Sequence, residues 1–233
     1  MKAIITGGTK GIGKAIGQLF LEKGVDIAIN SRSQEDLDAV KAEFQGSFPE
    51  REILTKLTDV SKPEEVKAFG EFVKSHWDKL DILINNAGAY VMGKLLEESE
   101  DVMVSQINTN LYSAVHMTRS MLPIMLPQQA GTIINMCSIA SLMSYPNSAS
   151  YTVSKFALHG YTKVLRDELK EKGIRVVAVM PGATWSAAWG DIDLPKDRLM
   201  AARDIALVCW NAIELSPAAV IEDIVIRPQL GDL

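Results

Sequence analysis

The stretch YTVSK, from Tyr151 to Lys155, places a phenol and an ammonium group four residues apart. On a helix these two positions share a face about one turn apart, so both groups can point into the same small volume. A tyrosine can give a proton to a developing alkoxide if its pKa of ~10 is brought towards working pH, and a nearby cation favours the phenolate. The pair is a candidate for proton transfer, although the same spacing is common on solvated helix faces.

A second chemical pattern is the glycine-rich stretch TGGTKGIG, which contains Gly7, Gly11 and Gly13 after the first strand-like run. Glycines let the backbone turn tightly and come close to a pyrophosphate, which then rests on the N-terminus of the following helix. The spacing here is G-x-x-x-G-x-G rather than the usual G-x-G-x-x-G. A plain turn is the alternative, but the position between a strand and a helix favours a dinucleotide site.

The end of the second strand bears on the choice of dinucleotide. Ser31 and Arg32 follow Asn30 there, and Lys10 lies in the glycine loop. An acidic residue at this point would bind the 2′-hydroxyl of NAD, but it would repel the 2′-phosphate of NADP. An arginine–phosphate hydrogen bond contributes ~1.5–3 kcal/mol. Unless these basic residues are incidental, the sequence predicts that NADP(H) is preferred over NAD(H).

The elements that must position these groups alternate between short apolar runs and longer stretches with helical spacing. Runs that are apolar on both faces are typical of buried parallel strands, and the alternation predicts βαβ units. We therefore expect an α/β fold, a doubly wound parallel sheet of the Rossmann type with helices on both faces, as a single domain over residues 1–233. Ser61 and Glu64 stand in capping-box register and predict a helix that begins there. The expected strands are 2–6, 25–30, 51–60, 81–85, 131–137, 174–180 and 221–226.

Composition limits the classes of partner. The net charge of −5 and the pI near 5.3 argue against nucleic acid or an anionic membrane surface. We find no signal-peptide pattern and no apolar run of the ~20 residues that span a bilayer, so we expect a cytoplasmic protein. Cys137 and Cys209 have no disulfide or zinc-ligand spacing, which predicts two small buried thiols and no metal site.

Taken in order, these motifs resemble the short-chain dehydrogenase/reductase family, in its single-domain branch. The resemblance covers essentially the whole chain: besides the glycine loop and YTVSK, the matching stretches are DV at 59–60, NNAG at 85–88, TNL around Asn110, CSIAS around Ser138 and PG at 181–182. It implies four catalytic residues, Asn110, Ser138, Tyr151 and Lys155. It also implies cofactor contacts from Gly7, Thr9, Lys10, Gly11, Ile12, Gly13, Ser31, Arg32, Asp59, Val60, Asn86, Ala87, Gly88, Tyr151, Lys155, Pro181, Gly182, Thr184 and Ser186.

The family's chemistry implies an oxidoreductase that reduces a ketone or aldehyde to an alcohol by hydride transfer. Tyr151 would donate the proton and Lys155 would make that transfer feasible, while Ser138 would hydrogen-bond the substrate oxygen. By the same resemblance, Asn110 would hold a water on a proton path behind Lys155. Residues 59–60 would border the adenine, 86–88 the riboses and 181–186 the nicotinamide.

Substrate contacts are expected after NNAG, after the catalytic serine and after PG. Their aromatic and thioether side chains favour an uncharged, apolar or planar carbonyl compound. The stretches GATWSAAW and IVIRPQLGDL look more like the sepiapterin-reductase and benzil-reductase side of the family than like its acyl-carrier-protein reductases. A 3-oxoacyl-thioester substrate is the alternative. The expected contacts are Tyr90, Met92, Leu142, Met143, Tyr145, Trp185 and Trp189.

Two other functions stay open at this point. A regulatory protein could bind NADP(H) on the same fold without turnover, since fold alone does not determine function. An epimerase or dehydratase of the extended branch is disfavoured by the glycine spacing and the short C-terminal region. We also expect a homodimer or homotetramer, assembled through the helices that begin near Asn110 and Tyr151.

Overall fold

The computed structural model describes residues 1–186, 194–195 and 198–232. Within these residues, seven parallel strands form one sheet in the order β3-β2-β1-β4-β5-β6-β7. This arrangement confirms the doubly wound parallel sheet. The strands are β1 (Lys2–Ile5), β2 (Asp26–Ser31), β3 (Ile53–Leu57), β4 (Ile82–Asn85), β5 (Gly131–Met136), β6 (Ile174–Pro181) and β7 (Asp223–Ile226).

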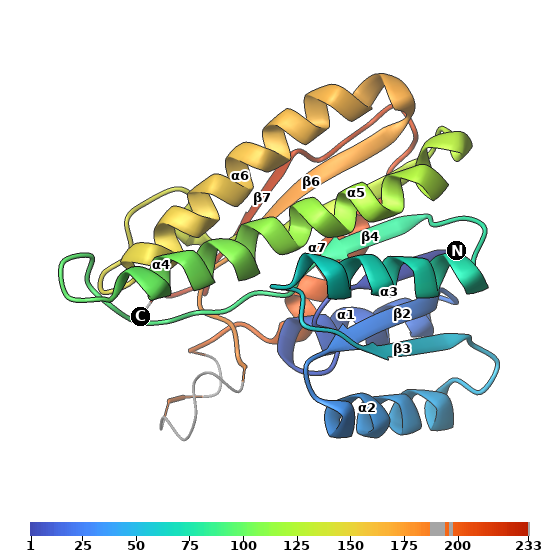
Figure 1. Ribbon diagram of the computed structural model, residues 1–233, viewed down its shortest axis with the longest axis horizontal. Helices are drawn as coiled ribbons and strands as arrows, with labels where there is room; N and C mark the ends of the chain where they lie inside the picture. The colour runs from blue at the N-terminus through green and yellow to red at the C-terminus, as the bar shows by residue number, and fades with distance from the viewer. Residues whose placement is uncertain (187–193, 196–197, 233) are drawn as a thin grey trace.

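Helices cover both faces of the sheet (Figure 1). On one face, α1 (Gly11–Glu22), α2 (Gln34–Ser47) and α7 (Ala202–Ile213) contribute to a core that contains Phe20, Phe44 and Trp210. On the other face, α3 (Pro63–His76), α5 (Ser113–Met125) and α6 (Ala149–Leu169) contribute to a core that contains Phe69 and Met121. Successive strand residues such as Ile4 and Ile5 enter opposite cores, as the two-residue period of a strand requires.

The helix expected after the third strand is present, but its predicted capping box is wrong. Lys62 is the N-cap of α3 and makes no side-chain capping bond, and Pro63 stands in the first turn. Proline suits this position because its missing N–H would have no helical partner anyway. The Oγ of Ser61 instead donates to Oδ1 of Asp59 at 2.7 Å, and Glu65 accepts the N–H of Asp59 at 2.6 Å. The turn therefore fixes Asp59 just beyond the end of β3.

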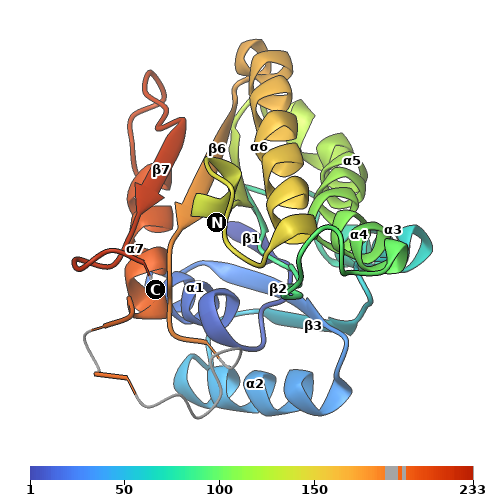
Figure 2. The same cartoon turned by 90° about the vertical axis from the view of Figure 1, so that its left-hand side faces the viewer.

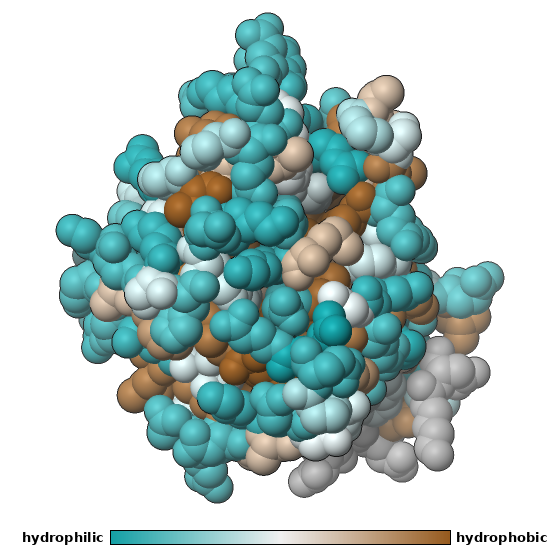
Figure 3. All heavy atoms as spheres, turned by 90° about the vertical axis from the view of Figure 1, so that its right-hand side faces the viewer, coloured by the Kyte–Doolittle hydropathy of each residue, from teal (hydrophilic) through white to brown (hydrophobic). Residues whose placement is uncertain are grey.

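Because the strands are parallel, their carboxyl ends lie on one side of the molecule and their amino ends on the opposite side. Figure 2 looks onto the carboxyl ends of the strands, where the strand order reverses between β1 and β4, the position at which open parallel sheets bind ligands. The opposite edge is covered mainly by hydrophilic side chains (Figure 3). The site residues expected from the sequence follow the carboxyl ends of the strands, so a functional site is expected at this end of the sheet.

The two cysteines are buried free thiols, as predicted. Burial raises the pKa of Cys137 to about 11 and that of Cys209 to about 12. Over the part of the chain that is described, no helix is both long and apolar enough to cross a bilayer.

Candidate active site

A cleft of 880 Å³ lies at the carboxyl edge, where the glycine loop meets the segments that follow β2, β3 and β4. Most of the cofactor contacts expected from the sequence line it. The lining consists of Gly7, Thr9, Lys10, Gly11, Ile12, Gly13, Asn30, Ser31, Arg32, Ser33, Asp36, Thr58, Asp59, Val60, Asn86, Ala87, Gly88, Thr109 and Ser186.

The glycine loop has the backbone geometry of an anion cradle. Gly7 and Gly11 have φ angles of 65° and 53°, in the left-handed region that favours glycine. The N–H of Gly7 donates to Oδ1 of Asn30 at 2.9 Å, which anchors the loop to β2. The N-cap of α1, Lys10, makes no side-chain capping bond, and no acidic residue stands in the first turn. The N-terminus of α1 therefore keeps its positive dipole end for an anionic ligand such as a pyrophosphate.

Thr6, which the sequence did not single out, joins the glycine loop to the NNAG segment. Its Oγ1 accepts the backbone N–H groups of Asn86 and Ala87, each at 2.9 Å. The side chain of Asn86 donates in return to the carbonyl oxygens of Thr6 at 2.9 Å and Gly7 at 3.2 Å. A side chain at Gly13 would overlap the Gly7 carbonyl and the Asn86 amide, so only glycine fits there. These contacts hold residues 86–88 against the loop.

Charged side chains line the part of the cleft formed by the glycine loop and by the segments after β2 and β3. Lys10 is paired with Asp36 of α2 at 2.8 Å. Arg32 also lines the cleft, and it has no ion-pair partner among the described residues. Burial alone would raise the pKa of Asp59, but hydrogen bonds from Ser61 and the charge of Arg32 lower it below its ordinary value. The cleft thus offers one unpaired guanidinium and one lysine already neutralised by a carboxylate.

Tyr151 and Lys155 lie in the first two turns of α6. The Nζ of Lys155 is 5.6 Å from the centroid of the Tyr151 ring, so the two groups share one face as the spacing predicted. Lys155 is 4% exposed and donates to the carbonyl oxygen of Met136, at the end of β5, at 2.8 Å. The ring of Tyr90 packs edge-on against Tyr151 with centroids 5.0 Å apart. Tyr151 is therefore held between an aromatic ring and a buried cation.

Ser138 follows β5 and caps a short 3₁₀ helix, Ile139–Ser141. Its Oγ accepts the N–H of Ala140 at 3.2 Å, which leaves its hydroxyl proton for another acceptor. Ser141 links this turn to α6, since its hydroxyl donates to the carbonyl oxygen of Lys155 at 2.9 Å. The turn that contains Ser138 is thereby hydrogen-bonded to the backbone of α6 at Lys155.

Asn110 lies in a π-helical turn, Asn108–Tyr112, between α4 (Glu100–Ile107) and α5. Its Oδ1 accepts the N–H of Ala89 at 2.7 Å, and its Nδ2 donates to the Ala89 carbonyl at 3.0 Å and to Oγ of Ser154 at 2.8 Å. The side-chain amide therefore braces the NNAG segment against α6 with its own protons. The sequence predicted a water-holding group and missed this bracing contact.

The family model described as short chain dehydrogenase matches residues 1–196. The chain belongs to the short-chain dehydrogenase family. An uncharacterised oxidoreductase of Staphylococcus saprophyticus is 29% identical over 226 residues, 97% of this chain and 96% of the relative. A sepiapterin reductase of Chlorobaculum tepidum is 28% identical over 238 residues, 99% of this chain and 97% of the relative.

Solved structures of the short-chain dehydrogenase fold agree with this assignment. L-sorbose reductase from Gluconobacter frateurii, in complex with NADPH and L-sorbose, has a TM-score of 0.90 at 25% identity, over 97% of this chain and 95% of that one. A metagenomic short-chain oxidoreductase in complex with NADP has a TM-score of 0.85 at 27% identity, over 98% of this chain and 97% of that one. The protein is therefore an oxidoreductase of this family.

In this short-chain dehydrogenase none of the predicted substrate contacts within the described residues belongs to the lining of the cleft, and of these residues Tyr90 packs against Tyr151. Tyr90 is 47% exposed and its hydroxyl is 2.9 Å from Oγ of Ser148. Burial, followed by the negative charge of Asp232, raises the pKa of Tyr145. Met92, Leu142 and Met143 are exposed, Trp185 is half-buried, and Trp189 lies outside the described residues.

Of the remaining cofactor contacts expected from the sequence, Tyr151 and Lys155 lie in α6, outside the lining of the cleft, and the others follow β6. Pro181 ends that strand, and Thr184 donates through Oγ1 to the Gly182 carbonyl at 3.0 Å. These three residues lie outside the lining of the cleft, whereas Ser186 is part of it.

Nowhere in residues 1–186, 194–195 and 198–232 do three His, Cys, Asp or Glu side chains gather closely enough to hold a metal ion.

Proposed function

We propose that the protein is an NADP(H)-dependent carbonyl reductase that reduces a ketone or aldehyde to an alcohol and runs in reverse as an alcohol dehydrogenase. The observation that carries the proposal is that Tyr151 and Lys155 share a face of α6, while the turn that contains Ser138 is hydrogen-bonded to the backbone of the same helix through Ser141. A proton donor, a buried cation and a hydroxyl that can bind an oxygen atom are the groups that carbonyl reduction requires.

The residues of the cleft fit a phosphorylated dinucleotide. The glycine loop and the uncapped N-terminus of α1 would hold the pyrophosphate, and residues 86–88 would hold the riboses. Arg32 would pair with the 2′-phosphate, because its guanidinium lines the cleft without an ion-pair partner in the described part of the chain. Residues 181–186 would contact the nicotinamide. NADPH, when bound, supplies a hydride.

The protein's own groups handle the proton. Tyr151 donates its phenolic proton to the substrate oxygen as negative charge develops there, and the ammonium of Lys155 stabilises the phenolate that remains. Ser138 donates a hydrogen bond to the same oxygen, which orients the carbonyl and disperses its charge. Tyr90 restricts the Tyr151 ring by edge-on packing, so the donor keeps one orientation.

We infer an uncharged carbonyl substrate with apolar or planar parts. Tyr90 packs edge-on against Tyr151, and the backbone N–H of Tyr145 donates to Oγ1 of Thr152, the next residue of α6. The similarity to a sepiapterin reductase supports a planar substrate over a 3-oxoacyl thioester. A strong preference for a small carboxylated substrate would contradict this inference.

The test is the loss of NADPH or NADH absorbance with a panel of aromatic diketones, pterin carbonyls, quinones, aldehydes and short 3-oxoacyl thioesters. Tyr151→Phe keeps the ring and removes the proton, so its kcat should fall by a factor on the order of 100 or more while NADPH binding is largely retained. Tyr161→Phe, a matched change on the same helix, should keep activity. A Tyr151→Phe protein as fast as wild type would contradict the proton-donor role. NADPH binding by wild type without turnover of any carbonyl would favour a regulatory protein.

A further inference from the structure

β7 is parallel to β6 and ends beside it, so the segment that follows β7 begins at the carboxyl ends of the strands (Figure 2). We call residues 227–232 the post-β7 segment. Pro181 and Ile226 are paired at the end of the two strands, and the N–H of Gly182 donates to the Ile226 carbonyl at 2.8 Å. The post-β7 segment therefore begins beside the residues that follow β6.

Asp232 is the centre of this segment's contacts. Its side chain is 6% exposed. Oδ1 accepts the backbone N–H of Ala183 at 3.2 Å, and Oδ2 accepts from Nε of Arg227 at 2.5 Å. Arg198 secures the backbone, since its guanidinium donates to the carbonyl oxygens of Gly231 at 2.7 Å and of Asp232 at 3.0 Å. A nearly buried carboxylate is thus aimed at one backbone amide of the turn after β6.

Gly182 shows how closely Asp232 approaches this turn. A Cβ added at Gly182 would overlap Oδ1 of Asp232 and would stand 3.2 Å from Cδ of Pro228. Any side chain at this position would push the carboxylate away from the Ala183 amide. The glycine that the family resemblance gave as a cofactor contact is therefore also required by the post-β7 segment.

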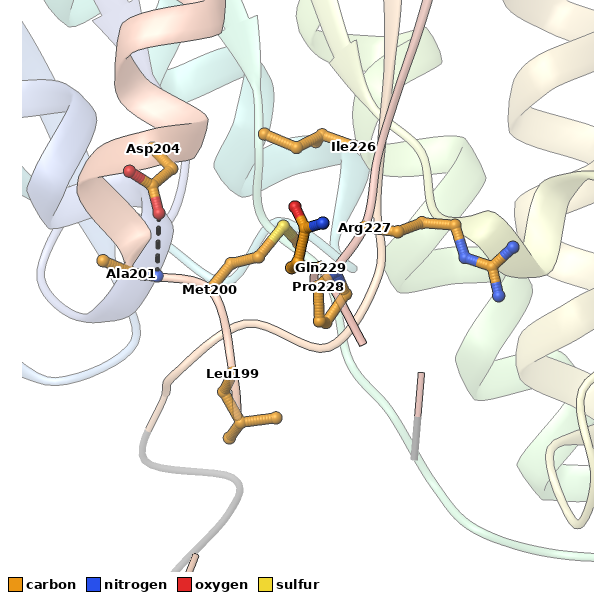
Figure 4. A pocket seen from close by; sticks show the side chains of 8 residues that line it. All are labelled: Leu199, Met200, Ala201, Asp204, Ile226, Arg227, Pro228 and Gln229. Atoms are coloured by element: carbon orange, nitrogen blue, oxygen red, sulfur yellow. Dashed lines mark hydrogen bonds between the residues drawn. The ribbon is translucent and has the colours of Figure 1, made fainter. Parts of the chain in front are cut away.

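The same turn is held from its other side. The Ala183 carbonyl accepts the N–H of Met200 at 3.1 Å, and the N–H of Trp185 donates to the Met200 carbonyl at 2.9 Å. Residues 199–201, Asp204 and residues 226–229 together line a cavity of 440 Å³ (Figure 4). Backbone hydrogen bonds to Met200 and the Asp232 carboxylate therefore both contribute to fixing the turn.

We propose that Asp232 is a positioning residue for the nicotinamide half of the cofactor: it fixes the Gly182–Thr184 turn that faces that group. This inference rests on the proposed function for the assignment of residues 181–186. After burial, which has the larger effect, the charge of the Asp232 carboxylate also raises the pKa of Tyr145, one of the expected substrate contacts. Removing it should loosen the turn and leave the adenosine half of the cleft intact.

The first experiment needs no cofactor. Amide hydrogen exchange of residues 182–186 should be at least about tenfold faster in Asp232→Ala than in wild type, because the Ala183 N–H loses its acceptor. Asp232→Asn keeps an oxygen acceptor and should give a smaller increase. Glu22→Ala, which removes the partner of Arg203 away from the site, is the control and should leave this peptide unchanged. Equal exchange in wild type and Asp232→Ala would overturn the proposal, whether or not the wild type binds NADPH.

The second experiment separates the two halves of the cofactor. Asp232→Ala should weaken NADPH binding about tenfold, which corresponds to roughly 1.4 kcal/mol, and should leave the affinity for 2′,5′-ADP unchanged. Equal weakening of both ligands would overturn the proposal, since it would indicate general destabilisation. A wild-type protein that binds neither ligand would contradict the proposed function instead.

A double-mutant cycle then tests the contact itself. Gly182→Ala should weaken NADPH binding to a similar extent, by displacing the carboxylate. In the Gly182→Ala/Asp232→Ala protein the overlap with the carboxylate is gone and only the 3.2 Å approach to Cδ of Pro228 remains, so the loss should be close to that of Asp232→Ala alone. Multiplicative losses would show that the two residues act independently and would overturn the proposal.

Discussion

At the scale of single residues, the structure places near the proposed 2′-phosphate site a carboxylate that the sequence did not reveal. The stretch after the second strand predicted two cations, Arg32 and Lys10, for the 2′-phosphate. The structure pairs Lys10 with Asp36, which stands in the first turn of α2 and lines the cleft. The sequence pattern for cofactor choice concerns an acidic residue at the end of β2, so it does not point to Asp36, which reaches the cleft from a helix. Lys10 must give up this pair before it can meet a phosphate.

We therefore expect opposite effects from two substitutions, measured as KM for NADPH and for NADH. Arg32→Ala should raise KM for NADPH by roughly tenfold and leave that for NADH within about twofold, because only NADPH carries the 2′-phosphate. Asp36→Asn should lower KM for NADPH severalfold, since it removes a repelling charge and frees Lys10. Asp38→Asn, the same change on the exposed face of α2, is the control. Equal effects on both cofactors would refute the 2′-phosphate assignment.

At the scale of elements, strands were easier to predict than the ends and irregular turns of helices. The buried run at 131–137 placed β5 within a residue of its observed end at Met136, because a continuous apolar run of that length has few other uses. The start of α3 was misplaced, since Pro63 outweighs a capping-box pattern two residues earlier. The π-helical turn around Asn110 has no sequence signature. It aims the amide at Ala89, a contact that only the folded chain reveals.

The turn gives a prediction about Asn110. Asn110→Ala should lower the free energy of unfolding by about 2 kcal/mol, because the half-buried backbone N–H and C=O groups of Ala89 both lose their partner. It should also lower kcat, as the NNAG segment shifts relative to Lys155. Urea unfolding and steady-state kinetics measure the two effects. Asn108→Ala, in the same turn, should cost less than about 0.5 kcal/mol. Full stability and activity in Asn110→Ala would show that the amide does not brace the segment.

At the scale of the whole molecule, the sequence sufficed for the layers and for most of the cleft but not for contacts between distant segments. The alternation of strands and helices specifies the sheet, and the sheet brings the ends of β1, β2 and β4 together. The hydrogen bond between Asp232 and Ala183 joins residues 49 positions apart, and the sequence around neither residue contains a pattern that predicts this contact. Such contacts depend on how the post-β7 segment closes over the edge, which local periodicity does not encode.

Self-association is also a property of the whole molecule, and our prediction of it depends on a row of exposed apolar side chains along α6. Val153 and Phe156 are each 46% exposed and Val164 is 58% exposed, and Gly160 between them has open space where a side chain would stand. These positions recur on one helix face, a pattern suited to packing against a second helix. We expect light scattering to give a multiple of the 25.5 kDa chain mass. Phe156→Glu and Val164→Glu should shift the protein towards 25.5 kDa, whereas Lys163→Glu, beside the stripe, should not. A wild-type protein that stays at 25.5 kDa at concentrations near 100 μM would contradict the oligomer, because an apolar helix interface of this kind should be populated at about that concentration.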